Sequence, residues 1–258
     1  MPASAFQFDP RLILARPDLA ELELEAVVPA SAYRAVQPMH GAVAVADIHA
    51  EVDAASPRID QLLAGEGFDV LDTRETMAWG RARRDGVVGW VALDALAEGP
   101  SRATHRMAMV GADLPLNALT DARPGAEPLG QFDSDPVIVA ERLIGVPHAL
   151  GARSSLSTDC AGMVQQALYA CGLAGPRYAD QQAELGHSVS RDNAARGDIA
   201  VWLHPEGGPG WTGHSALMLD ADRVIHASGD KGGVDVESFT EADARYRSND
   251  FSPPIFRR

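Results

Sequence analysis

The stretch LSTDCAGMVQQALYACGL, residues 156–173, places a cysteine where a polar loop gives way to a helical pattern. Five apolar residues then recur at helical spacing and share one face, namely Met163, Val164, Ala167, Leu168 and Cys171. Gly172 can end that helix. Cys160 therefore lies in the first turn, where free backbone N–H groups and the helix dipole stabilise a thiolate, so we expect a lowered thiol pKa. Without partners, such a cysteine is more often a small buried residue than a nucleophile.

Cys160 and Cys171 are the two cysteines of the chain. On a continuous helix they are about 16 Å apart, far beyond the reach of a disulfide. We therefore expect two free thiols, which fits a reducing compartment. Cys171 lies on the apolar face at the end of the helix, so its expected role is packing.

Two histidines downstream offer the chemistry that a cysteine nucleophile needs, because an imidazole takes the thiol proton and later protonates the leaving amine. His214 lies in the predicted strand GHSALML, after Gly213, which would let a substrate backbone approach closely. His226 interrupts the apolar strand RVIHAS and can orient the first ring. The two share a face of the hairpin only if their connection has an odd number of residues or a bulge. We predict such a connection near residues 220–223.

Changes in composition and hydrophobic spacing divide the chain into four parts. Residues 1–40 are expected to form an N-terminal arm with a short helix, and residues 41–100 a set of short strands separated by Gly, Pro and Asp turns. Residues 101–135 contain only short apolar runs. In residues 136–258, helical spacing comes first and predicted strands follow, which is typical of an α+β domain.

The clearest part of the second region is MAWGRARRDGVVGWV, where Asp85 and Gly86 mark a hairpin turn between two strands. Trp79 and Trp90 are expected to be core or groove residues. This pattern resembles the final hairpin of bacterial SH3-like domains, which are small all-β barrels. Residues 101–135 are then either a second, reduced SH3-like unit or a long connector.

Composition narrows the partners. The 258 residues carry a formal net charge of −14 without a basic stripe, which argues against nucleic acid as a partner. No stretch approaches the roughly 20 apolar residues of a membrane span. The first residues lack the continuous apolar segment of a signal peptide, so we expect a cytoplasmic protein with no membrane partner. The histidines and cysteines form no HxH, HExxH or CxxC pattern, so we expect neither a metal site nor a cofactor.

Four stretches in order, STDCAGMVQQAL, RGDIAVW, GHSALML and RVIHAS, resemble the motifs of NlpC-type cysteine peptidases of the papain-like class. The resemblance covers residues 136–229, and SH3-like domains are common N-terminal neighbours in this family. It implies a papain-like C-terminal domain with a helical half and an antiparallel sheet. It also implies that Cys160 is the nucleophile, that His214 is the general base and then acid, and that His226 orients His214.

Members with N-terminal SH3-like domains are similar to γ-D-glutamyl-L-diamino acid endopeptidases, which trim murein (peptidoglycan) peptides during wall recycling. The resemblance therefore implies a murein peptide as substrate, cleaved through a thioester. It also implies that Asp159 helps to bind the amino group of the substrate's N-terminal L-alanine. The same carboxylate would also serve as a plain helix cap.

Three positions depart from the family's pattern. His148 replaces a tyrosine thought to assist the oxyanion or the substrate, so either its ring supplies an N–H donor there or that role is lost. Val87 stands where a tyrosine commonly lines the substrate site, and Ala161 where many members have serine. Two other functions therefore stay open: a catalytically inactive module that binds wall peptides, and a related thiol amidase or acyltransferase with another substrate.

Overall fold

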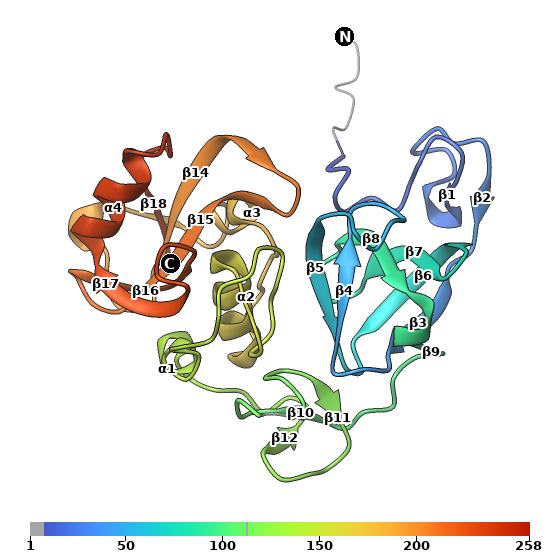
Figure 1. Ribbon diagram of the computed structural model, residues 1–258, viewed down its shortest axis with the longest axis horizontal. Coiled ribbons are helices and arrows are strands. Elements are labelled where there is room, and N and C mark those ends of the chain that lie inside the picture. Colours follow the sequence, from blue (N-terminus) through green and yellow to red (C-terminus); the bar gives the residue numbers. More distant parts are fainter. Residues whose placement is uncertain (1–7, 112) are drawn as a thin grey trace.

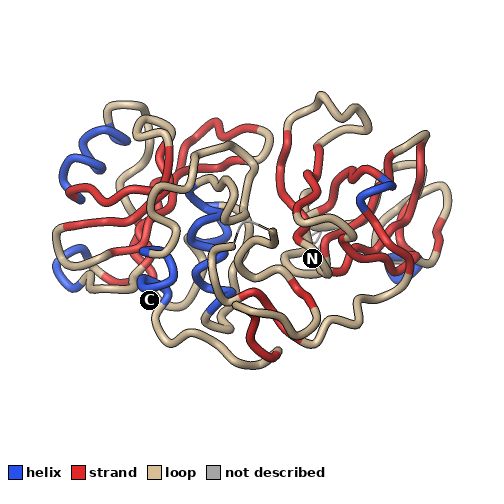
Figure 2. Tube along the Cα trace, turned by 60° about the horizontal axis from the view of Figure 1, so that its bottom comes forward, coloured by secondary structure: helices blue, strands red, loops and turns tan. Residues whose placement is uncertain are grey.

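The computed structural model describes residues 8–111 and 113–258, which form two lobes joined by a small sheet (Figure 1). Helices are concentrated in the C-terminal lobe, whereas strands dominate the N-terminal lobe (Figure 2). The fold is therefore the predicted α+β combination. Residues 1–7 of the predicted arm lie outside the described residues. In the described part of the chain, no helix is long and apolar enough to span a membrane.

The N-terminal lobe contains a seven-stranded antiparallel sheet of order β5-β4-β8-β7-β6-β3-β9. Its strands are β3 (Gln37–Gly41), β4 (Val45–His49), β5 (Arg58–Leu63), β6 (Gly67–Arg74), β7 (Met77–Ala82), β8 (Val88–Ala92) and β9 (Leu96–Glu98), with a 3-10 helix at Leu93–Ala95 before β9. In the preceding arm, β1 (Ala20–Glu21) pairs in parallel with β2 (Tyr33–Arg34). The short helix of the arm is the 3-10 helix Leu22–Leu24.

The predicted hairpin is confirmed, because β7 and β8 pair in antiparallel fashion with Trp79 opposite Trp90. Both side chains are buried, with ring centroids 6.5 Å apart. The guanidinium of Arg16 lies 4.1 Å from the centre of the Trp79 ring, and Leu14 joins the same apolar cluster. The two tryptophans are therefore core residues, covered by the N-terminal arm.

Residues 105–111 and 113–128 contribute a small three-stranded antiparallel sheet of order β11-β10-β12. Its strands are β10 (His105–Met107), β11 (Leu119–Thr120) and β12 (Ala126–Pro128). Met107 packs with Leu63 of β5, while the side-chain amide of Asn117 donates to the backbone carbonyl of Gln166 at 2.9 Å. This stretch is therefore folded and contacts both lobes.

The C-terminal lobe contains a six-stranded antiparallel sheet of order β13-β18-β14-β15-β16-β17. Its strands are β13 (Ser188–Val189), β14 (Ile199–Gly208), β15 (Trp211–Met218), β16 (Arg223–Ser228), β17 (Gly233–Ser238) and β18 (Ile255–Arg257). Its helices are α1 (Pro136–Glu141), α2 (Cys160–Ala170), α3 (Ala179–Gln182) and α4 (Phe239–Arg247), with a 3-10 helix at Arg191–Asn193.

The two faces of this sheet bury different helices, as the alternation of strand side chains requires. Leu217 and Ile225 pack with α1 and α2 in one apolar cluster. Trp202 and Val224 point to the other face and pack with α4. The helix that begins at Cys160 is thus held against the centre of the sheet.

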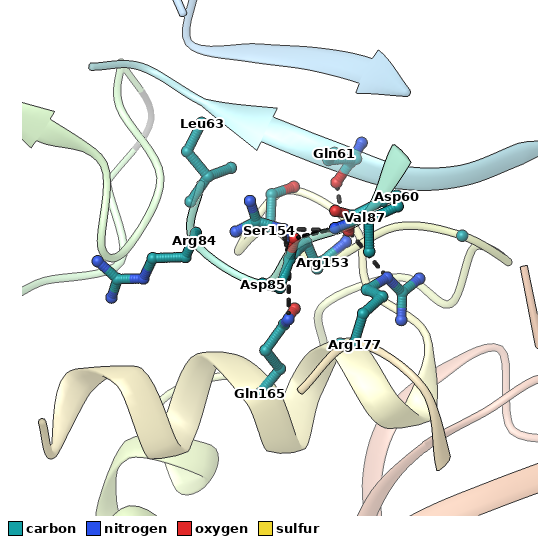
Figure 3. A network of polar contacts seen from close by, with 12 residues as sticks. Asp60, Gln61, Leu63, Arg84, Asp85, Val87, Arg153, Ser154, Gln165 and Arg177 are labelled. Carbon is teal, nitrogen blue, oxygen red and sulfur yellow. Dashed lines mark hydrogen bonds and ion pairs between the residues drawn. The ribbon is translucent and has the colours of Figure 1, made fainter. Parts of the chain in front are cut away.

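The lobes meet through a fully buried polar network (Figure 3). Arg153, in the loop before α2, places Nε 3.1 Å from Asp60 Oδ1 of β5 and also pairs with Glu66. Arg177 Nε lies 2.9 Å from the same Asp60 oxygen. Gln165 of α2 donates to Asp85 of the hairpin turn at 3.1 Å. Charged side chains of the N-terminal lobe therefore position both the loop before α2, which carries Arg153, and the segment after α2, which carries Arg177.

Candidate active site

Cys160 is the first residue of α2 and is 9% exposed. Its neighbour Asp159 is the N-cap, and Asp159 Oδ1 accepts a hydrogen bond from Gly162 N at 2.7 Å. Cys160 lines a pocket of about 110 Å³ that His148 and His214 also line. The structure thus brings together four of the five predicted site residues around one small cavity.

The fifth predicted residue, His226, contacts His214 directly. His214 Nε2 lies 2.7 Å from His226 Nδ1, and the two rings are nearly perpendicular. Leu219 N donates to Arg223 O, which leaves the odd connection Asp220–Asp222 between the strands. The predicted odd loop is therefore confirmed, and it places both rings on the face of the sheet that α4 covers.

Gly213 contacts Cys160 and directly precedes His214 in the chain. Cys160 Sγ lies 3.8 Å from the Gly213 carbonyl oxygen, next to His214 in the chain. A Cβ atom on Gly213 would lie only 2.4 Å from the carbonyl oxygen of Trp202 on β14. The glycine is therefore needed for close packing of two strands, and this explains it without the substrate approach that the sequence suggested.

The thiol pKa differs from the sequence-based expectation. Burial, and then the negative charge of Asp159, raise the pKa of Cys160 to about 12, although backbone hydrogen bonds and Arg177 oppose the shift. The expected lowering by the helix N-terminus is therefore wrong for the free protein. Desolvation disfavours the thiolate, and the capping carboxylate cancels part of the dipole's positive field.

His214 is held uncharged by its surroundings. Burial lowers its pKa well below the usual value, and the nearby His226, Arg245 and His148 act in the same direction. The ring of Tyr246 on α4 stacks on His214, with centroids 4.1 Å apart. The resting site therefore contains a protonated thiol and a neutral imidazole, so a proton must move as the sulfur attacks.

Both oxygens of Asp159 already have donors. Besides Gly162 N, Gly151 N donates to Oδ2 at 2.9 Å, and Arg177 donates to the two oxygens at 3.0 and 2.6 Å. The side chain is 4% exposed. This geometry favours the helix-cap interpretation over a contact with a substrate amine.

The three departures from the family's pattern occupy different places. His148 lines the pocket, and burial lowers the pKa of its ring, so it can supply a neutral N–H donor. Ala161 also lines the pocket. Val87 is fully buried in the core of the N-terminal sheet and does not itself line the pocket, although Tyr178, which belongs to the same apolar cluster, does.

Three neighbours of the site have no signal in the sequence motifs: Arg177, Glu237 and Tyr246. Arg177 pairs with Asp159, and Tyr246 packs on His214. Glu237 Oε1 lies 3.1 Å from His226 Nε2. Only the register of β16 with β17, in which His226 pairs with Asp235, indicates that Glu237 shares the face of His226.

Comparisons with known proteins agree with this geometry. Residues 48–96 match the bacterial dipeptidyl-peptidase SH3 domain, and residues 145–250 match the NlpC/P60 family. A γ-D-glutamyl-L-lysine dipeptidyl-peptidase from Bacillus subtilis is 28% identical over 127 residues, which are 49% of this chain and 42% of the relative. A murein DD-endopeptidase/murein LD-carboxypeptidase from Escherichia coli K12 is 33% identical over 108 residues, 41% of this chain and 54% of the relative.

The chain thus spans about half the length of the curated relatives it matches. Among solved structures, an NlpC/P60 family protein from Bacillus cereus superposes with a TM-score of 0.72 at 13% identity, covering 86% of this chain and 99% of the other. That similarity extends the shared fold across both lobes. The chain therefore carries a bacterial dipeptidyl-peptidase SH3 domain followed by a domain of the NlpC/P60 family, a family of cysteine peptidases.

Proposed function

We propose that this chain is a cysteine peptidase that hydrolyses murein peptides at the γ-D-glutamyl-L-diamino acid bond. The observation that carries the proposal is one pocket lined by both Cys160 and His214, with His214 held 2.7 Å from His226. The relatives named above include a γ-D-glutamyl-L-lysine dipeptidyl-peptidase and a murein endopeptidase, which supports a murein peptide as the substrate.

The proposed reaction uses the neutral resting pair. His214 accepts the Cys160 proton as the sulfur attacks the scissile carbonyl carbon, and His148 supplies a donor to the developing oxyanion. The C–N bond then breaks, and His214 gives its proton to the leaving amine, which leaves a thioester. Water loses a proton to His214 and attacks this thioester, and the C–S bond breaks to regenerate the thiol.

The proposal is tested with L-Ala-γ-D-Glu-meso-diaminopimelate and its N-acetyl derivative, with products identified by mass spectrometry. Release of diaminopimelate supports the proposal. Because the Asp159 oxygens already have four donors, we expect the two peptides to be cleaved within about tenfold of each other, a difference of about 1.4 kcal/mol. A strict requirement for the free amine would instead indicate that substrate displaces Arg177 from Asp159.

The other functions predict other results with the same peptides. Tight binding without product, measured by calorimetry, would indicate a wall-peptide binding module. Transfer of the acyl group to added hydroxylamine or an amine, in place of hydrolysis, would indicate an acyltransferase.

Activity should persist below pH 6.5. The general base fails only when His214 becomes protonated, and burial lowers the pKa of His214 well below the usual 6.5. The acid limb of kcat/KM should therefore lie below 6.5 when rates are measured between about pH 4 and 8. An acid limb at or above 6.5 would contradict the neutral, buried imidazole.

A further inference from the structure

His226 contacts a buried carboxylate, Glu237, through the ring nitrogen that does not contact His214. Glu237 of β17 is 7% exposed, and its Oε1 lies 3.1 Å from His226 Nε2. Its Oε2 accepts from Arg245 Nη1 at 2.9 Å, and Lys231 Nζ lies 3.5 Å from the same oxygen. The order Arg245, Glu237, His226, His214 therefore runs from α4 to the pocket.

The carboxylate decides where the protons of the two rings lie. If His226 Nε2 carried a lone pair, two acceptors would face each other 3.1 Å apart in a buried site, which is unfavourable. The contact is close but not a linear hydrogen bond, so Glu237 acts on the ring mainly through its charge. A His226 ring with a single proton therefore carries it on Nε2, and its Nδ1 is then an acceptor.

His214 must then donate across the 2.7 Å contact. With its proton on Nε2, the other nitrogen, Nδ1, keeps the lone pair that a general base requires. In the opposite arrangement, His226 would donate to His214 Nε2, and His214 Nδ1 would carry the proton. That ring would be unable to accept a proton from the thiol at Nδ1.

We propose that Glu237 is a positioning residue that sets the tautomers of His226 and His214 and so keeps His214 Nδ1 unprotonated. The kinetic consequence rests on the proposed peptidase function, but the proton positions do not depend on it.

The charges around Glu237 keep it ionised. Burial alone would raise the pKa of Glu237, but its contacts with His226 and Arg245 outweigh burial and hold the pKa well below the usual range. Two more charged groups lie at this cluster: Lys231, whose Nζ is 3.5 Å from Glu237 Oε2, and Asp230, whose carboxylate lies 3.0 Å from Arg245 Nε. His148 and Arg245 are the further groups whose charges act on His214.

The direct test is ¹⁵N NMR of the histidine rings in the full-length protein near neutral pH, without substrate. The ring shifts separate protonated from unprotonated nitrogens, and histidine variants assign them. The expected spectrum has His226 and His214 both protonated on Nε2 and unprotonated on Nδ1. A doubly protonated His226, or a proton on His214 Nδ1, would overturn the proposal, and this measurement does not require Glu237→Gln to fold.

The kinetic test compares Glu237→Gln with Glu241→Gln, the same change at an exposed position of α4. Loss of the Glu237 charge lets the His226 and His214 rings exchange tautomers. It also disfavours the protonated, imidazolium form of His214. We therefore expect kcat to fall about 10²-fold, within the usual range for acid–base catalysis, with KM nearly unchanged and the acid limb moved to lower pH. Glu241→Gln should match the wild type in kcat, in KM and in the position of the acid limb.

Two further outcomes separate this role from others. If Glu237→Gln only lowers the melting temperature, with kcat, pH profile and ring shifts unchanged, then Glu237 serves the ion pair with Arg245 and the proposal fails. If the wild-type tautomers are as expected but no murein peptide is cleaved, the positioning role stands and the proposed substrate is wrong.

Discussion

Replacement of Cys160 by alanine should reduce peptide hydrolysis by about 10⁴-fold or more, because the covalent route is lost with the nucleophile. Cys160 is one of two cysteines in the chain, and the other, Cys171, caps the far end of α2. The substitution removes a single heavy atom, Sγ, from the wall of a 110 Å³ pocket, so the fold should survive. The rate is measured on L-Ala-γ-D-Glu-meso-diaminopimelate by mass spectrometry, with circular dichroism to confirm folding.

The matched control is Cys171→Ala, the same substitution on the same helix. Cys171 is partly buried against the main core of the C-terminal lobe, so its loss should cost some stability and leave kcat unchanged. Equal losses in the two variants would indicate that Cys160 acts through packing. Full activity of Cys160→Ala would remove the covalent mechanism altogether.

Local signals in the sequence were sufficient for the centre of the site. The helical spacing after Cys160 predicted where α2 begins, and the strand patterns around His214 and His226 predicted a hairpin that brings the rings together. The parity argument worked because strand side chains alternate with a period of two, so an odd connection determines which rings share a face. The SH3-like hairpin was predictable for the same reason, from its turn residues and its alternating strands.

Properties that depend on distant parts of the chain were not predictable in this way. The helix-start position of Cys160 suggested a lowered pKa, but burial and the Asp159 carboxylate reverse the direction. The family resemblance implied that Asp159 binds an amine, with a plain helix cap as the alternative, and nothing local in the sequence showed that Arg177 would pair with it. Glu237 belongs to no motif, and only the pairing of β16 with β17 places it beside His226.

The largest expected effect on stability comes from Arg153, whose partners are 87 and 93 residues away in the chain. Its guanidinium is fully buried between Asp60 and Glu66, with Asp85 Oδ2 3.7 Å from Nε. Arg153→Met removes this cation, which leaves the buried Asp60 with Arg177 alone and the buried Glu66 with only Arg84, 3.9 Å away. Breaking a buried ion pair in this way typically costs about 3–5 kcal/mol in the free energy of unfolding.

The cost should be visible in thermal and urea unfolding, at about 2–4 °C of melting temperature per kcal/mol for a chain of this size. Arg223→Met is the matched control, because the Arg223 and Asp220 side chains are 57% and 43% exposed. An exposed pair of this kind contributes little to stability. If both variants lose equally little, the network does not hold the lobes together.

A large loss confined to Arg153→Met would indicate that the N-terminal lobe and the C-terminal lobe unfold as one unit. Asp60 is the reason, since it contacts both Arg153 and Arg177, and Arg177 in turn holds the Asp159 cap of helix α2. A change in the position of Asp60 in β5 would then be transmitted toward Cys160 through the side chains of Arg177 and Asp159. We therefore expect Arg153→Met to lower kcat as well as stability, although Arg153 does not line the pocket.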